Sequence, residues 1–299
     1  MIDHVDVRAS VPLAPMTTYK VGGPARWFAE PDDLEALRSI LEVTPADIEV
    51  IVLGRGSNVV IADAGVDGLV LRLGRGFSAF DVLPDGIVVS GAATALPVLA
   101  RGVAAAGRSG LEFYVGIPGS VGGAVRMNAG GHGSDTASVL VDASVLDIRS
   151  RSVERRNVGE LDLSYRHSNL TDTDIVLQAR YETESCDPQD AETVLRDITR
   201  WRKEHQPGGT LNAGSVFKNP ANESAGSIID RLGLKGERFG PVSVSEVHAN
   251  FLVATKEASA SDIFLFVNRI RSIVAEQTAI DLEPEIRFIG SFPNAEVAP

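Results

Sequence analysis

The sequence of 299 residues contains one cysteine, has no surplus of basic residues and lacks a long apolar run. The single Cys186 excludes an internal disulfide and a thiolate metal cage, and it is typical of a reducing compartment. The 28 Lys and Arg against 40 Asp and Glu give a formal net charge of −12. That balance argues against nucleic acid as a partner, because binding nucleic acid requires basic surface.

The longest uncharged stretch covers residues 86–100 and is interrupted by Ser, Thr and Pro. It is shorter than the roughly 20 apolar residues of a membrane-spanning helix. Residues 1–16 show neither the basic nor the apolar region of a signal peptide. We therefore expect a soluble, cytoplasmic protein without a membrane partner.

The rest of the composition is that of a globular protein, with 44% hydrophobic and 23% charged residues. The length suggests two domains. The segments 48–58, 68–76 and 86–93 each pair a β-branched strand with a Gly-rich exit, and further strands are predicted at 139–148, 174–182 and 285–290. Apolar spacing and end signals predict helices at 32–43, 96–107, 187–205, 226–232 and from 261 onward. We predict an α+β fold, with a strand-rich first part and a smaller, helix-bearing part from about residue 200.

Glycine clusters are the most distinctive motifs. The sequence LGRGSNV at 53–59 follows a predicted strand, and its small residues could let backbone N–H groups converge on an anion. A simple tight turn explains this motif equally well. The stretch 116–133 contains seven glycines, which favours a loop that cradles a ligand. The G-x-G-x-x-A match at 74–79 is not a dinucleotide fingerprint, because no helix is predicted to begin there.

Other chemical motifs are weak. The five histidines are too far apart to form a metal-ligand pair by spacing, so we expect no metal. Three polar stretches remain, SYRHS at 164–168, NAGSVFKNP at 212–220 and LEPEIRF at 282–288. Each of these, taken alone, is more typical of a solvated loop or a strand edge than of a functional site.

The sequence GIPGSVGGAVRMNAG at 116–130 resembles the UDP-N-acetylenolpyruvoylglucosamine reductase (UDP-N-acetylmuramate dehydrogenase) family. The resemblance begins at Thr17-Thr18-Tyr19 and continues through LGRGSN, SYRHS and AGSVFKNP to LEPEIRFIG, so it covers almost the whole chain. The chain lacks a longer insertion between Ser164 and Ser215 and another after Pro220. It is therefore similar to the shorter branch of the family.

The resemblance implies an FAD-binding scaffold of two α+β subdomains, of the vanillyl-alcohol-oxidase/PCMH type, plus a C-terminal α+β substrate-binding domain. The implied boundaries are 1–75 with 285–299, 76–200, and 201–284. It also implies non-covalent binding of FAD. The implied FAD-binding residues are Gly54, Arg55, Gly56, Ser57, Asn58, Gly116, Pro118, Gly119, Ser120, Gly122, Gly123 and Asn128.

The activity implied by the resemblance is NADPH-dependent reduction of the enolpyruvyl group of a UDP-sugar, a step of peptidoglycan precursor synthesis. By family position, Ser215 is the proton donor, and Arg166 and Glu285 stabilise the enolate-like intermediate. Tyr165, Lys218 and Asn219 match substrate contacts. The chain has His205 near the position of a family lysine, and either His205 or Lys203 could contact the diphosphate.

We expect a monomer whose partners are the UDP-sugar and NADPH. Two alternatives remain open at the level of the sequence. One is a flavin oxidase on the same scaffold, although such oxidases commonly tether the flavin through His or Cys, and Cys186 is distant in sequence from the glycine motifs. The other is a flavin-binding module without catalytic activity.

Overall fold

The computed structural model describes residues 6–293, and the chain forms two compact units. Each unit is assembled from three separate stretches of the sequence. The first unit contains Met1–Ala9, Trp27–Arg55 and Gly68–Arg202, and the second contains Ser10–Arg26, Gly56–Asp67 and Lys203–Pro299.

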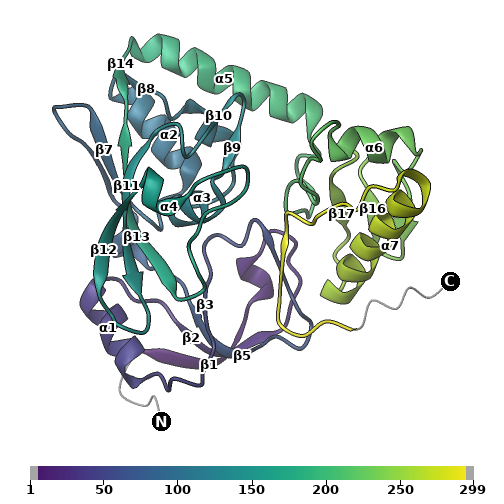
Figure 1. Cartoon of the computed structure of the whole chain (residues 1–299), viewed down its shortest axis with the longest axis horizontal. Coiled ribbons are helices and arrows are strands. Elements are labelled where there is room, and N and C mark those ends of the chain that lie inside the picture. The colour runs from purple at the N-terminus through teal and green to yellow at the C-terminus, as the bar shows by residue number, and fades with distance from the viewer. Residues whose placement is uncertain (1–5, 294–299) are drawn as a thin grey trace. The chain divides into compact units, whose positions relative to one another are not determined.

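The first unit is built on a five-stranded antiparallel sheet with the strand order β12-β11-β13-β7-β6 (Figure 1). Its strands are β6 (Phe80–Val82), β7 (Ile87–Gly91), β11 (Leu140–Asp147), β12 (Val153–Asn157) and β13 (Asp174–Glu182). Buried and half-buried side chains alternate along β7, as expected for a strand with one face against a core. The edge strand β12 is exposed along most of its length.

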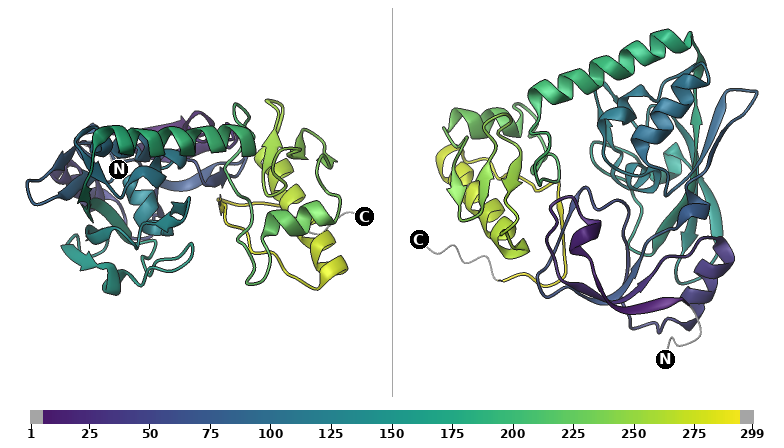
Figure 2. Two further views of the ribbon diagram at one scale, coloured as in Figure 1. Left: turned by 90° about the horizontal axis from the view of Figure 1, so that it is seen from above. Right: turned by 180° about the vertical axis from the view of Figure 1, so that it is seen from behind.

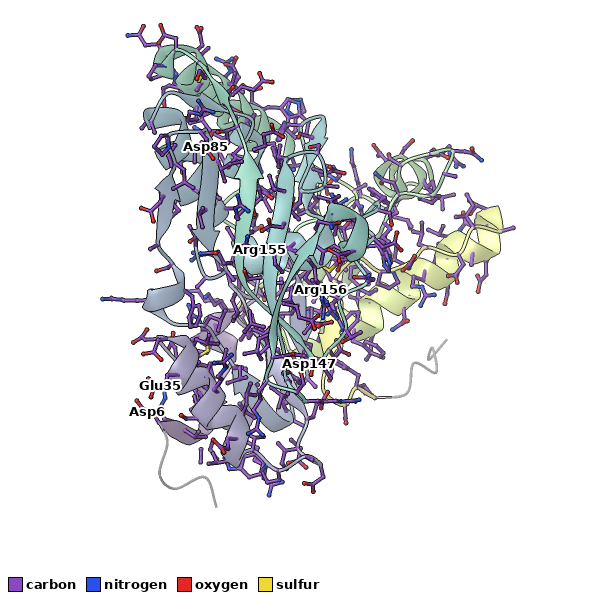
Figure 3. The ribbon with its side chains drawn as sticks, turned by 60° about the vertical axis from the view of Figure 1, so that its left-hand side comes forward. Asp6, Glu35, Asp85, Asp147, Arg155 and Arg156 are labelled. Carbon is purple, nitrogen blue, oxygen red and sulfur yellow. The ribbon has the colours of Figure 1, made fainter. Side chains whose placement is uncertain are left out.

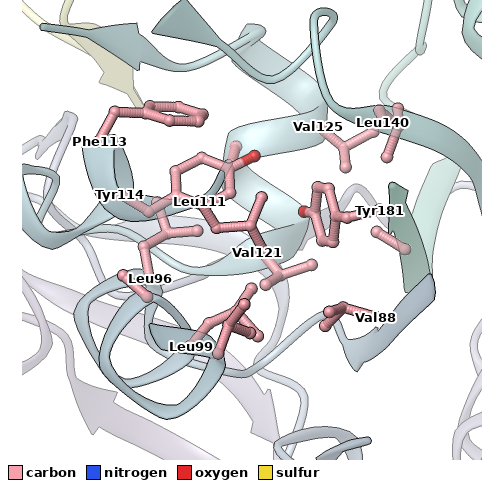
Figure 4. Close-up of a cluster of buried hydrophobic side chains, with 14 of the residues drawn as sticks. Val88, Leu96, Leu99, Leu111, Phe113, Tyr114, Val121, Val125, Leu140 and Tyr181 are labelled. Atoms are coloured by element: carbon pink, nitrogen blue, oxygen red, sulfur yellow. The ribbon is translucent and has the colours of Figure 1, made fainter. Parts of the chain in front are cut away.

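Helices α2 (Leu96–Ala105) and α3 (Val121–Met127) pack with this sheet, and α5 (Pro188–His205) contributes its buried side to the same core. Figure 4 shows the centre of this core, where the rings of Tyr114 and Tyr181 meet edge to face with centroids 5.8 Å apart. The Tyr114 hydroxyl lies 2.9 Å from the Thr136 hydroxyl. Burial raises the pKa of Tyr114 to about 12, so this phenol stays neutral.

A second core of the first unit lies under α1 (Leu34–Val43). Helix α1 begins after Asp33, whose carboxylate accepts a hydrogen bond from the Ala36 N–H at 2.8 Å. Its buried Leu37, Ile40 and Leu41 pack with side chains of β5, β11 and β13. A four-stranded sheet has the order β1-β2-β5-β3, and β3 and β5 run parallel. Its strands are β1 (Val7–Pro12), β2 (Pro24–Ala29), β3 (Val50–Val52) and β5 (Val66–Leu71).

The second unit combines a three-stranded antiparallel sheet with two helices (Figure 2). These elements are α6 (Ala225–Arg231), β15 (Arg238–Phe239), β16 (Val242–Val244), β17 (Leu252–Ala254) and α7 (Ala260–Thr278). Helix α7 begins with a capping box formed by Ser259 and Asp262, and its apolar stripe is buried. Strand β18 (Arg287–Ile289) pairs in parallel with β4 (Val59–Ile61), which brings together two distant parts of the chain.

Shorter elements connect these parts. They are η1 (Ala14–Met16), η2 (Arg75–Phe77), η3 (Glu112–Gly116), α4 (Val158–Leu161), β8 (Arg108–Ser109), β9 (Gly130–Gly131), β10 (Ser134–Asp135) and β14 (Glu184–Ser185). Within residues 6–293, no helix combines the length and the apolar character needed to cross a membrane.

One predicted element is wrong. The sequence predicts a continuous loop over 116–133, but this stretch contains the helix α3. The helix forms because Val121, Ala124 and Val125 are buried in the core of the first unit, which outweighs the low helix propensity of Gly122 and Gly123. The five predicted helices are confirmed, and α7 begins slightly earlier than expected, after the N-cap Ser259.

Candidate active site

Ser215 lies in the second unit, in an extended segment that runs beside the segment containing Glu285. It is half-buried and follows Gly214, whose φ of +79° favours glycine. The Glu285 N–H donates to the Val216 carbonyl at 2.7 Å, and the Lys218 N–H donates to the Glu283 carbonyl at 2.9 Å. The fold therefore places two of the three predicted catalytic residues on adjacent, hydrogen-bonded segments.

The backbone around Glu285 is also held by Asn58, one of the predicted FAD-binding residues. The Asn58 side-chain amide donates to the Glu285 carbonyl at 3.0 Å, and the Asn58 carbonyl accepts from the Arg287 N–H at 2.9 Å. These bonds continue the pairing of β4 with β18. The structure thus gives the Asn58 side chain a partner within the protein, and its predicted contact with FAD stays a prediction.

Three of the four residues predicted to bind substrate also lie in the second unit. The Lys218 ammonium forms an ion pair with Glu283 at 2.6 Å, and the Asn219 side-chain oxygen accepts from the Ala225 N–H at 3.0 Å. His205 is the final residue of α5 and is exposed. The Lys218 ammonium therefore keeps two further N–H donors beside its bond to Glu283.

The first glycine motif crosses from one unit to the other at Arg55. Gly54 and Arg55 are exposed, whereas Gly56 is buried. Gly56 has φ of +62°, and a Cβ at this position would lie 2.1 Å from the Met16 carbonyl oxygen. Gly56 is therefore required by packing against Met16, and Ser57 beside it is half-buried.

The second glycine motif forms the approach to α3 in the first unit. A Cβ on Gly54 would lie 2.8 Å from the Ser120 hydroxyl, so the two glycine motifs meet in this unit. Gly122 donates its N–H to the Ala92 carbonyl, and Gly119 accepts from the Leu96 N–H. The other predicted FAD-binding residues of this motif differ in exposure: Gly116 is half-buried, and Pro118 and Gly123 are exposed.

The close approach of the two motifs fits a bulky anionic cofactor. Side chains are absent at Gly54, Gly119 and Gly123, and a Cβ on Gly54 would fill the space in front of Ser120. Such a surface lets a diphosphate approach the backbone closely. The exposed Arg55 adds a cation next to it. The residues present can therefore hold the diphosphate of FAD.

Asn128 orders the turn that carries Arg166. It is buried and has a left-handed φ of +39°. Its side-chain amide donates to the Ser164 carbonyl at 2.9 Å, and its oxygen accepts from the Ala137 N–H at 2.8 Å. The Asn128 side chain thus bonds to protein groups, and its predicted role at FAD stays a prediction.

Tyr165 and Arg166 lie at the tip of a tight turn closed by two hydrogen bonds between Ser164 and His167. Arg166 has φ of +54°, which is unusual for a residue other than glycine and fixes the direction of its side chain. Its guanidinium lies over the Tyr165 ring, 5.2 Å from the centroid, and donates to the Gly130 carbonyl at 3.1 Å. The turn presents a permanent cation beside an exposed aromatic ring.

A polar hollow of about 760 Å³ lies elsewhere in the first unit, at β12 and the ends of β11 and β13. Figure 3 shows Asp147, Arg155 and Arg156, which contribute to its lining. Arg156 is paired with Asp174 at 3.0 Å, and Arg155 with Asp142 at 3.7 Å. None of the predicted site residues lines this hollow, so it is separate from the candidate active site.

Comparison with known families assigns a class to this fold. Residues 25–152 match the model described as "FAD binding domain". Residues 206–289 match the model described as "UDP-N-acetylenolpyruvoylglucosamine reductase, C-terminal domain". The fold and its paired glycine motifs therefore define an FAD-binding flavoprotein, an oxidoreductase of mixed α+β architecture.

Full-length relatives then identify the family. The chain is 40% identical over 298 residues to the UDP-N-acetylenolpyruvoylglucosamine reductase of Synechococcus sp. (strain RCC307), covering 98% of this chain and 97% of the relative. It is 41% identical to that of Caulobacter sp. (strain K31), covering 93% of each chain. A crystal structure of the reductase from Thermus caldophilus is similar with a TM-score of 0.81, at 35% identity, covering 96% of this chain and 99% of that one. The chain belongs to the UDP-N-acetylenolpyruvoylglucosamine reductase family.

These findings confirm several predictions made from the sequence. The family resemblance is confirmed, as is the α+β fold with an FAD-binding scaffold of the PCMH type and a separate C-terminal domain. The enzyme class, an FAD-dependent oxidoreductase, is confirmed as well.

Proposed function

We propose that the chain reduces the enolpyruvyl group of UDP-N-acetylenolpyruvoylglucosamine to give UDP-N-acetylmuramate, with NADPH as the electron source. The observation that carries this proposal is the pairing of the Ser215 and Glu285 segments through the Val216 carbonyl and the Glu285 N–H. FAD, when bound, would supply the hydride-transfer chemistry that links NADPH to the enolpyruvyl group. The protein then needs to stabilise negative charge at C2 and to deliver a proton there.

We assign the proton delivery to the Ser215 hydroxyl. A serine hydroxyl is a weak acid, so it requires a neighbouring group or a water molecule that relays charge. Glu285, on the adjacent segment, serves this purpose if it is protonated or if it orients a water, because a bare carboxylate would repel an enolate. Arg166 carries a permanent charge, and its planar guanidinium can hold the substrate carboxylate through two parallel hydrogen bonds.

The remaining assignments concern binding. We propose that Gly54–Asn58, Gly116–Gly123 and Asn128 form the surroundings of FAD, which is bound without a covalent link. Tyr165, Lys218, Asn219 and His205 are proposed substrate contacts. We further propose that the chain is a monomer. We also propose that it works in the cytoplasm, because NADPH and nucleotide-activated sugars are made inside the cell. The proposed domains are 1–75 with 285–299, 76–200 and 201–284, and the pairing of β18 with β4 supports grouping the first with the last stretch.

The test separates the two half-reactions. We expect the purified protein to be yellow, NADPH to bleach its visible absorption, and the enolpyruvyl sugar to restore it. Ser215→Ala should leave bleaching by NADPH nearly unchanged and slow the restoration by about 100-fold or more, within the range of a lost proton donor. Ser227→Ala, an exposed serine of the same unit, is the matched control.

Two results would contradict the proposal. Equal loss of both half-reactions in Ser215→Ala would exclude its role as proton donor. Rapid reoxidation by oxygen with a sugar or alcohol as the electron donor, and no reaction with the enolpyruvyl sugar, would identify a flavin oxidase instead. A yellow protein that reacts with neither would be a binding module.

A further inference from the structure

Asn250 is a buried residue whose polar groups are all engaged around the segment that follows Ser215. Its side chain is 3% exposed. The side-chain oxygen accepts from the Phe217 N–H at 2.9 Å, and the side-chain amide donates to the Phe217 carbonyl at 2.8 Å. The Asn250 carbonyl accepts from the Val216 N–H at 2.9 Å, and its own N–H donates to Nδ1 of His248 at 3.2 Å.

The Asn250 side chain thus hydrogen-bonds to the Phe217 main chain in the way that a residue of a neighbouring strand would. It offers a donor and an acceptor side by side in one planar group, which matches the N–H and carbonyl of a single residue in a β ladder. Burial makes each of these bonds expensive to lose, because a released backbone group would have no water to bind. Phe217 is therefore fixed in a single register.

The opposite edge of the same segment is fixed by the chain around Glu285. The Val216 carbonyl accepts from the Glu285 N–H, and the Lys218 N–H donates to the Glu283 carbonyl. Residues 216–218 are consequently the central one of three hydrogen-bonded segments, with Asn250 on one side and Glu285 on the other. A change at Asn250 therefore alters the segment that directly follows Ser215 and is hydrogen-bonded to the Glu285 backbone.

We propose that Asn250 is a positioning residue for the reduction of the enolpyruvyl group. It fixes the main chain next to Ser215, so that the Ser215 hydroxyl keeps its place relative to Glu285. The inference rests on the proposed function, because it takes Ser215 as the proton donor. Proton transfer requires donor and acceptor atoms within about 2.6–3.2 Å, and a misplacement of about 1 Å can reduce a rate by about 100-fold.

The experiment uses the FAD-loaded, full-length protein with Asn250→Ala and the isosteric Asn250→Asp. Aspartate is the second variant if alanine prevents folding, and it retains the acceptor for the Phe217 N–H. Ionised aspartate lacks the donor to the Phe217 carbonyl and protonated aspartate restores it, so the effect of this variant should grow as the pH rises. Rates are measured per molecule of bound flavin, which leaves unfolded protein out of the comparison. We expect NADPH to bleach the flavin at a rate within about 2-fold of wild type, and reoxidation by UDP-N-acetylenolpyruvoylglucosamine to slow about 10- to 100-fold.

Two further measurements distinguish positioning from general stability. The solvent deuterium isotope effect on reoxidation should increase, because proton delivery becomes rate-limiting, while KM for the sugar changes little. Amide hydrogen exchange should become faster at Val216, Phe217 and Glu285. Asn268→Ala is the matched control, because this residue in α7 of the same unit also donates its amide to a backbone carbonyl, that of Phe264. It should alter neither half-reaction.

The inference is overturned if Asn250→Ala and Asn250→Asp slow both half-reactions equally, slow neither, or leave amide exchange at Val216 and Phe217 unchanged. A wild-type protein that NADPH bleaches but the enolpyruvyl sugar does not reoxidise would instead defeat the proposed function, and with it the role of Asn250. A normal wild type with insensitive variants would defeat the role of Asn250 alone.

Discussion

Two buried tyrosines show how the contribution of a hydroxyl to the free energy of unfolding depends on its hydrogen-bond partner. The Tyr19 hydroxyl donates to the Leu252 carbonyl at 3.0 Å within the second unit. Among the described side chains, the Tyr181 hydroxyl is buried without a hydrogen-bond partner. Burial raises the pKa of both phenols above the ordinary value, so both are neutral at pH 7.

The same substitution should therefore have different effects at these positions. We expect Tyr19→Phe to lower the free energy of unfolding by about 1–3 kcal/mol, because the Leu252 carbonyl is left buried and unsatisfied. We expect Tyr181→Phe to change it by less than about 0.5 kcal/mol, because no hydrogen bond is lost. Urea unfolding followed by far-UV circular dichroism, which reports on the secondary structure of both units, measures both changes. A similar loss in the two variants would contradict this explanation.

The sequence indicates which type of site is present, but it does not indicate which groups each site residue is hydrogen-bonded to. The family resemblance implies FAD contacts for Asn58 and Asn128, yet their side chains bond to Glu285 and Ser164. No local pattern identifies these partners, because Asn58 and Glu285 are 227 positions apart. Asn250 was missed for the same reason: an asparagine between alanine and phenylalanine carries no motif, and only the fold reveals Phe217 beside it.

At the scale of elements, the N-terminus of α7 has a second anion partner besides its own capping box of Ser259 and Asp262. The Asp63 carboxylate, between β4 and β5, accepts hydrogen bonds from the Ala260 N–H at 2.8 Å and from the Ser261 N–H and hydroxyl at 2.9 and 2.6 Å. Burial alone would raise the pKa of Asp63, but the Ser261 hydroxyl and these two N–H groups together hold it below the ordinary value. The negative charge also suits the positive end of the helix.

This cap predicts a pH-dependent stability difference. We expect Asp63→Ala to lower the free energy of unfolding by about 1 kcal/mol at pH 7, as for other N-cap substitutions. Because the pKa is lower in the folded state, the contribution of the carboxylate is present above about pH 4 and is lost as the pH falls through the folded value. Urea titrations between pH 3 and pH 7 should show the difference shrinking only at the acidic end.

Asp67→Ala is the matched control for Asp63, because Asp67 forms an exposed ion pair with Arg26 in the same unit and should contribute little. A difference between Asp63→Ala and wild type that stays constant down to pH 3 would rule out the ionised cap.

Elements with strong periodicity were predictable, and short ones were not. Leu34, Leu37 and Leu41 identify α1 because its stripe matches the helical period. The strands β1 and β2 were missed, because arginines and prolines interrupt their apolar pattern. Helix α3 was missed because it is stabilised by burial in the core and by the Ala92 and Thr94 carbonyls, which accept from Gly122 and Val121, and not by local propensity.

At the scale of the whole molecule, the cofactor should contribute to stability by mass action. FAD binds the folded chain, so an FAD concentration 100-fold above its Kd should add about 2.7 kcal/mol to the apparent free energy of unfolding. We expect the thermal midpoint of FAD-stripped protein to rise steadily with added FAD. Riboflavin, which lacks the diphosphate, should raise it much less. A midpoint independent of FAD would contradict the assignment of the glycine motifs to the diphosphate.

The net charge of −12 illustrates what whole-chain quantities can predict. It argues against nucleic acid, but it does not exclude FAD, NADPH or a UDP-sugar, all of which are anionic. We propose that such ligands are bound by local features, namely backbone N–H groups at the glycine motifs and placed cations such as Arg166. The sequence also suggested two domains by length and three by resemblance, while the structure interleaves stretches of sequence in both units, an arrangement that length cannot predict.

The pairing of β18 with β4 has a consequence for biosynthesis. Val59 to Ile61 emerge from the ribosome long before Arg287 to Ile289 are translated. Strand β4 therefore cannot pair with β18 while most of the chain is being made. The second unit cannot close around this strand until the C-terminal region arrives. Since the same returning segment carries Glu285, a prematurely terminated product would lack both the closing strand and a proposed catalytic group. Completion of the polypeptide and assembly of the site are thereby coupled in time.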